Sequence, residues 1–334
     1  VSWTLRQVEQ TQSMIRLVGL SATLPNCQDV GNFLRVPEPN LFIFGPEYRP
    51  VPLAMTLIGS KNTQETPQGF KQVFEENYMA SRDKDSVQID VIAVEEVMKN
   101  VKQGHQVLIF VHTRGETSRF ANLLTKYVTL PVSNELNQLV GHARSMQPSL
   151  RECLLKGVGI HHAGLPRSDR LFVEGKFRSN LFQVLICTAT LAWGVNLPAH
   201  TVIIKDTKVY NQEQGGYQDI GILDVHQMFG RAGRPQFDTS GHAILITTNK
   251  SLPKYTTTLV NAEPIQSRLS TKIEDFLNAE ISLGTVTCRK DAFQWIKYTF
   301  LYQTHRYDPK VEEQFTMLLN NAEKGKMGEV EQKL

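Results

Sequence analysis

Two arginines three residues apart have the side chains and spacing best suited to chemistry. Arg231 and Arg234 lie in the run QMFGRAGRP, which begins at Gln227 and holds two glycines. A guanidinium keeps its charge and forks onto two phosphate oxygens, as phosphoryl transfer requires of an arginine that stabilises the transferred group. The spacing predicts both arginines on one helical face. Taken alone, the run fits a surface helix end with two solvated arginines equally well.

Small polar residues follow four apolar runs that we predict to be strands. These polar clusters are Ser21-Ala22-Thr23, His112-Thr113-Arg114, His161-His162-Ala163-Gly164 and Thr188-Ala189-Thr190. In a doubly wound sheet, ligands gather at the loops that leave the carboxyl ends of the strands, where hydroxyls and backbone donors suit phosphate oxygens. Any one cluster is explained by strand ends and helix caps. Together, on one predicted edge, they favour a phosphate-binding surface.

Several other kinds of chemistry are disfavoured. Adjacent His161 and His162 point in different directions and have no third ligand at a suitable spacing, so we expect no metal. Trp193 could stack on a base, but core packing is the favoured explanation. The sequence contains no G-x-x-x-x-G-K-[ST] phosphate loop, no Asp-Glu pair after a strand and no Ser-His-Asp signature. A dehydrogenase is excluded because no G-x-G-x-x-G follows a strand.

Alternating strands and helices predict an α/β fold with a doubly wound parallel sheet. The predicted strands are residues 16–20, 41–44, 107–111, 158–160, 184–187, 202–204 and 243–246. The predicted helices of this part are residues 114–128, 168–177 and 220–231. Gly215-Gly216 predicts a tight hairpin within 208–220. Residues 61–90 are predicted to be a surface excursion, and apolar spacing after residue 250 predicts a small helical domain.

Composition is that of an ordinary globular protein. The chain has 334 residues, 41% of them hydrophobic, and a net charge of +3, which neither demands nor excludes nucleic acid. Its longest aliphatic run, residues 107–111, is far shorter than the roughly 20 residues of a membrane span. Four scattered cysteines without a C-x-x-C pair argue against zinc and disulfides and fit a reducing compartment.

Three motifs together resemble those of a known family. Ser21-Ala22-Thr23, residues 188–198 (TATLAWGVNLP) and residues 227–235 (QMFGRAGRP) resemble motifs III, V and VI of superfamily 2 DExH-type nucleic-acid helicases. Their order and spacing are those of the branch that contains the spliceosomal U5 unwinding helicase and the cointegrator-complex helicase subunit. Residues 159–164 (GIHHAG) resemble motif IVa of that branch. The resemblance covers about residues 3–300.

The resemblance implies a role for particular residues. Ser21 and Thr23 would couple the ATP state to the grip on nucleic acid. The implied nucleic-acid contacts are Thr113, Arg114, His162, Thr188 and Thr190. The implied ATP contacts are Gly194, Asn196, Gln227, Arg231 and Arg234, the last three also being catalytic. The cofactor would be ATP with Mg²⁺, whose ligands the family places outside this chain, and the 208–220 hairpin would be the wedge that splits a duplex.

The resemblance also implies a domain order. Residues 1–48 would end a first RecA-like lobe and 49–56 would link the lobes. Residues 57–250 would form the second RecA-like lobe and 251–307 part of a helical winged-helix domain. Residues 308–334 would be a polar tail, either a solvated helix or disordered. We therefore expect a piece of a longer protein, from motif III to the start of the winged-helix domain.

The implied function is a portion of an ATP-dependent helicase that couples hydrolysis to translocation and unwinding, inactive by itself. Its expected partners are single-stranded or partly duplex DNA or RNA and a multiprotein complex, with no membrane. Its expected location is intracellular, in the nucleus with the cytoplasm as an alternative, and DNA repair is an expected process. The alternative is a non-catalytic helicase-like scaffold. Gln227, Arg231 and Arg234 favour the enzyme, on the premise that nothing structural requires both arginines.

Overall fold

The computed structural model describes residues 1–11, 15–21, 24–60, 84–143, 145–211, 215–260 and 264–305, together with Glu313 and Thr316. It divides into two compact units. One consists of Val1–Glu47 and Ala262–Leu334, and the other is Tyr48–Asn261. The predicted tail at 308–334 lies outside the described residues apart from Glu313 and Thr316.

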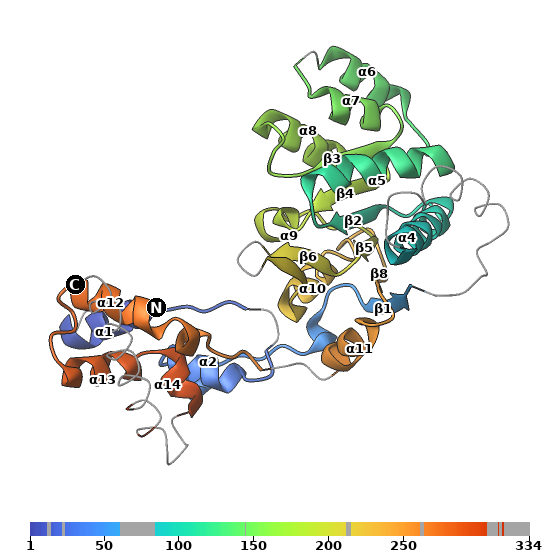
Figure 1. The fold of residues 1–334 in the computed structure, drawn as a ribbon. Coiled ribbons are helices and arrows are strands. Elements are labelled where there is room, and N and C mark those ends of the chain that lie inside the picture. Colours follow the sequence, from blue (N-terminus) through green and yellow to red (C-terminus); the bar gives the residue numbers. More distant parts are fainter. Residues whose placement is uncertain are drawn as a thin grey trace. The chain divides into compact units, whose positions relative to one another are not determined.

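A six-stranded parallel sheet forms the centre of the Tyr48–Asn261 unit (Figure 1). In spatial order its strands are β1 (Leu53–Gly59), β8 (Gly241–Thr247), β5 (Thr201–Lys205), β2 (Val107–Val111), β4 (Val184–Thr188) and β3 (Val158–His161). Every residue of β2, β3, β4 and β5 is buried, as expected for strands covered on both faces. The α/β class and the five predicted strands from residue 107 onwards are confirmed.

Helices flank this sheet. They are α4 (Lys84–Lys102), α5 (Arg114–Tyr127), α6 (Asn134–His142), α7 (Pro148–Leu154), α8 (Arg167–Arg178), α9 (Thr190–Gly194), α10 (Ile222–Phe229) and α11 (Leu252–Val260). The predicted surface excursion is wrong where α4 begins, because Ile89 and Asp90 are buried. The rest of that excursion, residues 61–83, lies outside the described residues.

The segment around Pro50 and Pro52 leads directly into the sheet. The predicted linker ran from 49 to 56, yet Leu53 already pairs with Gly241 at the start of β1. Pro52 lacks an amide hydrogen but still accepts a bond from the Gly241 amide at 2.7 Å. Pro50 and Pro52 are therefore compatible with an extended segment that continues directly into β1 at Leu53.

The predicted hairpin is present. It consists of β6 (Lys208–Asn211) and β7 (Gly216–Asp219), which pair antiparallel, while residues 212–214 lie outside the described part of the chain. The predicted helix at 220–231 is shorter, because α10 ends at Phe229 and Gly230 caps it. Arg231 and Arg234 lie in the following loop, so the prediction that they share a helical face is wrong.

The second unit is helical. Its elements are α1 (Ser2–Thr11), α2 (Cys27–Phe33), three short 3-10 turns (Glu38–Asn40, Pro46–Tyr48 and Leu269–Thr271), α12 (Ile273–Ser282), α13 (Arg289–Lys297) and α14 (Phe300–His305). Its small core is formed by Ile273, Leu277, Val286, Ala292, Trp295, Ile296 and Leu301. On α12, Ile273 and Leu277 are buried whereas Phe276 and Ile281 are exposed.

Two predicted strands of this unit are wrong. Residues 16–20 and 41–44 form no strand, although both have a β-type sequence. Leu20 is 94% exposed and Phe42 is 70% exposed. Most of their apolar side chains are thus exposed, and neither segment pairs with a neighbouring strand among the described residues.

Replacing Gly233 should destabilise the chain more than replacing Gly104. Both have a left-handed backbone, with φ of +83° and +81°. A Cβ at Gly233 would lie 2.6 Å from Val51 Cγ1, whereas a Cβ at Gly104 meets nothing within 4 Å. We expect Gly104→Ala to lower the free energy of unfolding by about 1 kcal/mol through backbone strain alone. Gly233→Ala should lower it by about 3 kcal/mol, because overpacking against a stiff valine adds to the strain.

Urea unfolding of the two variants measures this difference. The shared backbone conformation makes Gly104→Ala the matched control for strain. Equal losses in the two variants would contradict the close approach of Val51 to Gly233.

Candidate nucleic-acid interface

Three predicted clusters leave neighbouring strands at one edge of the sheet. Strand β4 lies between β2 and β3, with Val111 paired to Thr188 and His161 paired to Cys187. The residues that follow these positions therefore emerge side by side at the carboxyl edge. The fourth cluster is different: Ser21 lies in the helical unit and follows no strand, and Thr23 lies outside the described residues.

Arg114 and His162 meet at Gly164. The Gly164 amide donates a hydrogen bond to His162 Nδ1 at 3.1 Å. A Cβ at Gly164 would lie 3.2 Å from the Arg114 side chain, so the glycine makes the approach possible. Burial lowers the pKa of His162, and the charge of Arg114 lowers it further. At neutral pH the pair thus presents an exposed guanidinium beside an uncharged imidazole.

The hydroxyls of Thr188 and Thr190 lie at the end of β4, the strand between those that lead to Arg114 and His162. Their Oγ1 atoms are 3.0 Å apart and hydrogen-bonded. Thr188 is buried at the end of β4, and Thr190 is exposed in the first turn of α9. One hydroxyl hydrogen stays available in such a pair. The edge can therefore offer a guanidinium, an imidazole and a hydroxyl to phosphate oxygens.

Arg231 contacts the helix that follows this threonine pair. Its Nη2 donates to the Ala192 carbonyl of α9, and its Nη1 donates to Asn196 Oδ1 at 3.2 Å. Burial lowers the pKa of Arg231. Its Nε is buried and has no hydrogen-bond partner among the described residues. Within the described part of the chain, this Nε donor of Arg231 is therefore unsatisfied.

The remaining predicted nucleotide contacts of this area are at the surface. Gly194, Asn196 and Gln227 are exposed, on or beside α9 and α10. Trp193 is 65% exposed, so the favoured explanation of core packing is wrong.

Arg234 has a different environment from Arg231. Its Nε and Nη2 donate to the two oxygens of Asp238 at 2.9 and 3.0 Å, and its Nη1 donates to Gln106 Oε1 at 2.7 Å. Gln106 directly precedes β2, at the amino edge of the sheet. The premise that nothing structural requires both arginines is therefore wrong, because Arg234 ties its own loop to the start of β2.

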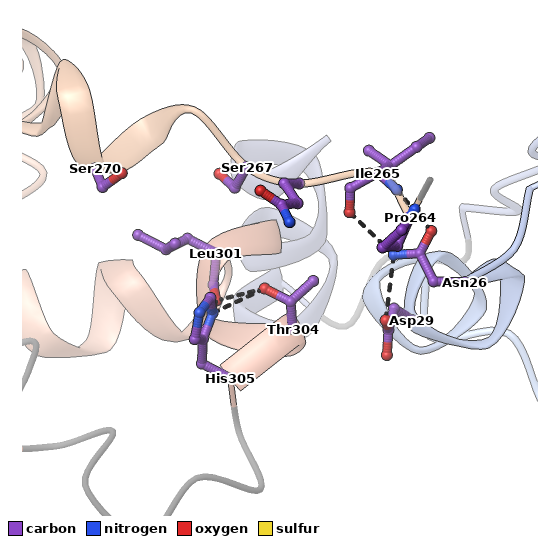
Figure 2. Close-up of a pocket in the computed structure, with 10 residues that line it drawn as sticks. Asn26, Asp29, Pro264, Ile265, Ser267, Ser270, Leu301, Thr304 and His305 are labelled. Atoms are coloured by element: carbon purple, nitrogen blue, oxygen red, sulfur yellow. Dashed lines mark hydrogen bonds between the residues drawn. The ribbon is translucent and has the colours of Figure 1, made fainter. Parts of the chain in front are cut away.

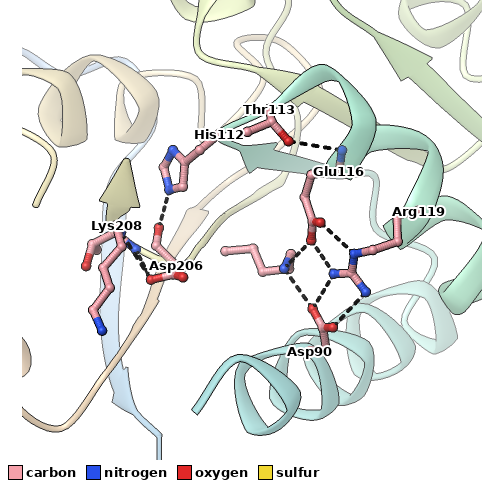
Figure 3. Close-up of polar contacts among 9 residues, drawn as sticks. Asp90, His112, Thr113, Glu116, Arg119, Asp206 and Lys208 are labelled. Atoms are coloured by element: carbon pink, nitrogen blue, oxygen red, sulfur yellow. Dashed lines mark hydrogen bonds and ion pairs between the residues drawn. The ribbon is translucent and has the colours of Figure 1, made fainter. Parts of the chain in front are cut away.

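Sequence reasoning missed a cluster of four charged residues, two of them buried and two partly buried; Figure 3 labels Asp90, Glu116 and Arg119 of this cluster. Its members are Asp90 of α4, Glu116 and Arg119 of α5, and Lys205 at the end of β5. Lys205 Nζ lies 2.7 Å from both Asp90 Oδ1 and Glu116 Oε1. Arg119 donates to Asp90 Oδ1 at 2.9 Å and to Glu116 Oε2 at 2.5 Å. Two cations thus balance two anions. We call this group the charge quartet.

The charge quartet holds the first turn of α5. Thr113 caps this helix by accepting a bond from the Glu116 amide at 3.2 Å, as the T-x-x-E pattern predicts. The Glu116 carboxylate faces the quartet instead. Burial alone would raise the pKa of Glu116, but Arg119 and Lys205 outweigh burial and lower the pKa from its ordinary 4.5 to about 2. The only sequence signals were the capping box and a lysine at the end of an apolar strand.

A polar hollow lies within the helical unit (Figure 2). It has a volume of about 520 Å³ and is lined by residues of the 26–29, 264–270 and 301–305 segments. Asn26 joins two of these segments by donating to the Ile265 carbonyl and accepting from the Ile265 amide. The lining contains Asp29 and no lysine or arginine, so it does not suit a phosphate.

Two further searches cover the described part of the chain. In that part, no three His, Cys, Asp or Glu side chains gather in a way that could hold a metal ion. None of the helices there is long and apolar enough to cross a membrane.

Comparison with known proteins identifies both units. Residues 89–236 match the helicase conserved C-terminal domain, and residues 266–314 match a winged helix-turn-helix domain. The sheet unit is thus a RecA-like helicase domain, and a winged-helix domain follows it. The chain belongs to the superfamily 2 DExH-type helicases, in the branch suggested by its motifs.

The curated relatives are much longer proteins. Activating signal cointegrator 1 complex subunit 3 of Gallus gallus is 47% identical over 93% of this chain. The Homo sapiens protein of the same name is 46% identical over 92%. The DExH-box ATP-dependent RNA helicase DExH14 of Arabidopsis thaliana is also 46% identical over 92%. The chain spans 14% of the length of each of these relatives.

Removing Lys205 should strongly destabilise the sheet unit. Its side chain is 6% exposed and neutralises two buried carboxylates. We expect Lys205→Met to lower the free energy of unfolding by about 3 kcal/mol, because a buried negative charge loses its partner. The control is Lys208→Met, three residues on and exposed, which should change it by about 0.5 kcal/mol or less. Similar urea midpoints for both variants would contradict the role of the charge quartet.

Glu116 should make stability depend on pH between about 4.5 and 2. Its pKa is lowered in the folded chain, so its contribution is complete above 4.5 and is lost as the pH falls towards 2. The shift corresponds to about 3 kcal/mol. Glu116→Gln should be less stable than the unaltered chain at pH 7 and should lose less stability on acidification. Urea unfolding at several pH values tests this, and parallel pH profiles would contradict it.

Proposed function

We propose that this chain supplies the second motor lobe of an ATP-dependent RNA helicase. The observation that carries the proposal is the meeting of three segments at one sheet edge, those of Arg114, His162 and Thr188. Together they offer the charge and hydrogen bonds that suit a phosphate backbone. The name of the Arabidopsis relative favours RNA over DNA.

In this proposal the carboxyl edge holds single-stranded nucleic acid through its phosphates. Thr113, Arg114, His162, Thr188 and Thr190 contact the backbone without reading the bases. Because such contacts release counterions, binding weakens as salt rises. A strand that enters this edge from a partly duplex substrate is the proposed ligand.

The hairpin formed by β6 and β7 is the proposed wedge. Tyr210 and Tyr217 face each other across it, 52% and 75% exposed, with ring centroids 5.4 Å apart at 73°. Exposed aromatic rings can stack on unpaired bases. The pair would hold the first bases released from a duplex.

We propose Arg231 as the arginine that faces the nucleotide. Its buried Nε lacks a partner among the described residues, and Gly194, Asn196 and Gln227 are exposed nearby, so these residues fit an anionic ligand. Bound ATP with Mg²⁺ would supply the free energy of phosphoryl transfer. Arg231 would stabilise the transferred group, and Gln227 and Asn196 would orient it.

We assign Arg234 a supporting part in the same reaction. It would have to leave Asp238 to reach a nucleotide, so its proposed task is to hold the loop that carries Arg231. The coupling roles of Ser21 and Thr23 remain predictions, since Ser21 belongs to the helical unit and Thr23 lies outside the described residues.

A non-catalytic scaffold is the second candidate. One observation favours it: the bonds of Arg234 to Asp238 and Gln106 explain that arginine without catalysis. The unsatisfied Nε of Arg231 favours the enzyme. In either case the relatives' names lead us to propose a subunit of a multiprotein complex. The nuclear or cytoplasmic location and the link to DNA repair remain predictions.

Arg114→Ala should weaken the binding of a single-stranded RNA. We expect the dissociation constant to rise about tenfold and the slope of log K against log salt to fall by about 0.7, for one lost phosphate contact. Fluorescence anisotropy with a labelled oligonucleotide measures both. The control is Arg178→Ala, which removes an equal charge from an exposed position at the far end of α8.

The outcomes show whether the carboxyl edge binds nucleic acid and whether it prefers RNA. An equal loss in both variants would show that general charge, and not the carboxyl edge, binds RNA. A DNA oligonucleotide of the same sequence that binds equally well would refute the preference for RNA.

A further inference from the structure

Asp206 has an unusual backbone at the root of the hairpin. It lies between β5 and β6 with a φ of +71°, which few residues other than glycine adopt. Its own carboxylate supports this conformation, since Oδ1 accepts bonds from the Thr207 amide at 2.6 Å and the Lys208 amide at 3.1 Å. The conformation turns the chain out of the sheet and into β6.

His112 holds the carbonyl of this residue. His112 Nε2 lies 2.7 Å from the Asp206 oxygen, as Figure 3 shows. A carbonyl can only accept, so the ring donates its Nε2 hydrogen. His112 directly precedes Thr113 and Arg114 in the chain. One hydrogen bond therefore joins the segment proposed to contact phosphate to the root of the hairpin.

A second contact connects the same two segments. Lys205, the neighbour of Asp206, contacts Glu116 in the first turn of α5 through the charge quartet. Strands β2 and β5 are themselves paired up to Phe110 and Ile204. Two contacts thus hold the end of β5 to the start of α5. One is made by the backbone carbonyl of Asp206, and the other is made by the side chain of Lys205.

The other end of the hairpin is anchored elsewhere. The Ile220 amide donates to the Thr207 carbonyl at 2.8 Å, and the Tyr255 hydroxyl of α11 donates to the Ile220 carbonyl at 2.8 Å. Asp219 accepts a bond from Ser251 at 3.1 Å. The entry is also tied to β8, since the Asp206 amide donates to the Ile246 carbonyl at 3.0 Å and the hydroxyls of Thr207 and Thr247 lie 2.6 Å apart. Against these anchors, the bond from His112 is the one that ties the entry to the residues just before α5.

We propose that His112 is a positioning residue that fixes the direction of the hairpin relative to the Thr113–Arg114 segment. This rests on the proposed function, in which that segment grips a strand and the hairpin splits the duplex. A phosphate that moves the start of α5 would move the Asp206 carbonyl with it. Grip on the strand and orientation of the wedge would then change together.

Hydrogen exchange of the 334-residue chain tests this in two steps, the first without RNA. His112→Ala should speed exchange of the amides at 207–211 and 216–220 about threefold to tenfold, as expected for the loss of one hydrogen bond. His112→Gln keeps a donor at a similar reach and should restore slow exchange. The control is His142→Ala, which removes an exposed histidine bonded to a backbone carbonyl of α6. It should leave the hairpin unchanged.

The second step adds a single-stranded RNA oligonucleotide. In the unaltered chain, binding should slow exchange both at 113–116 and in the hairpin. In His112→Ala, the effect at 113–116 should persist and the effect in the hairpin should be lost. A merely structural residue would not separate the two regions in this way.

Each outcome decides something. A hairpin that exchanges and responds to RNA equally in His112→Ala and the unaltered chain overturns the proposal. If His112→Ala does not fold, His112→Gln carries the test, and fast hairpin exchange in that variant overturns it. If the unaltered chain binds no RNA, the proposed function fails, while the first step still decides whether His112 sets the hairpin.

Discussion

The in-register pairing of β4 with β2 and β3 is the constraint on which the candidate site depends. Thr188 pairs with Val111, and Cys187 pairs with His161. The three strands therefore end nearly level with one another, and the polar loops that follow them begin side by side. A slip of one residue would turn every side chain of a strand to the opposite face. Because all three strands are buried on both faces, no alternation of apolar and polar residues sets their register, and the close fit of different side chains in the core opposes a slip instead. The packed core thereby sets how Arg114 and His162 lie relative to each other.

The charge quartet contributes more to the position of α5 than to the free energy of unfolding. Burying two carboxylates, a lysine and an arginine carries a large desolvation penalty, and a well-packed apolar group would give similar stability. An apolar group, however, would not require its neighbours to adopt one particular spacing and orientation. Lys205 can reach Asp90 and Glu116 together only when α4, α5 and β5 are correctly spaced. The quartet therefore fixes the first turn of α5, and with it the loop that carries Thr113 and Arg114.

Much of this architecture could be predicted from sequence because its signals are local. Strands buried on both faces give uninterrupted apolar runs, a capping box marks the start of α5, and Gly215-Gly216 marks the hairpin. The failures have physical causes too. Residues 16–20 and 41–44 have strand-like sequences, yet a strand also needs a neighbour, which no local pattern reveals. The quartet joins positions 29 and 115 residues apart, so only the folded chain brings them together.

The environments of Arg231 and Arg234 also could not be predicted from sequence, although these two residues are close together in the chain. Arg231 and Arg234 are three positions apart in the sequence, and a helix would have aligned them. The helix stops at Phe229, and the loop turns one guanidinium towards α9 and the other towards the start of β2. Spacing identified the right residues, whereas their different environments depend on Asp238 and Gln106, which no motif includes.

The uncovered apolar runs of the helical unit affect how the protein behaves in solution. Phe42, Ile43 and Phe44 are 70%, 60% and 60% exposed, and large apolar side chains that lie together at a surface favour association with other molecules. We therefore expect concentrated samples of the chain to associate through these runs. Charged or proline substitutions there would improve solubility and leave the sheet unit, with its candidate site, untouched.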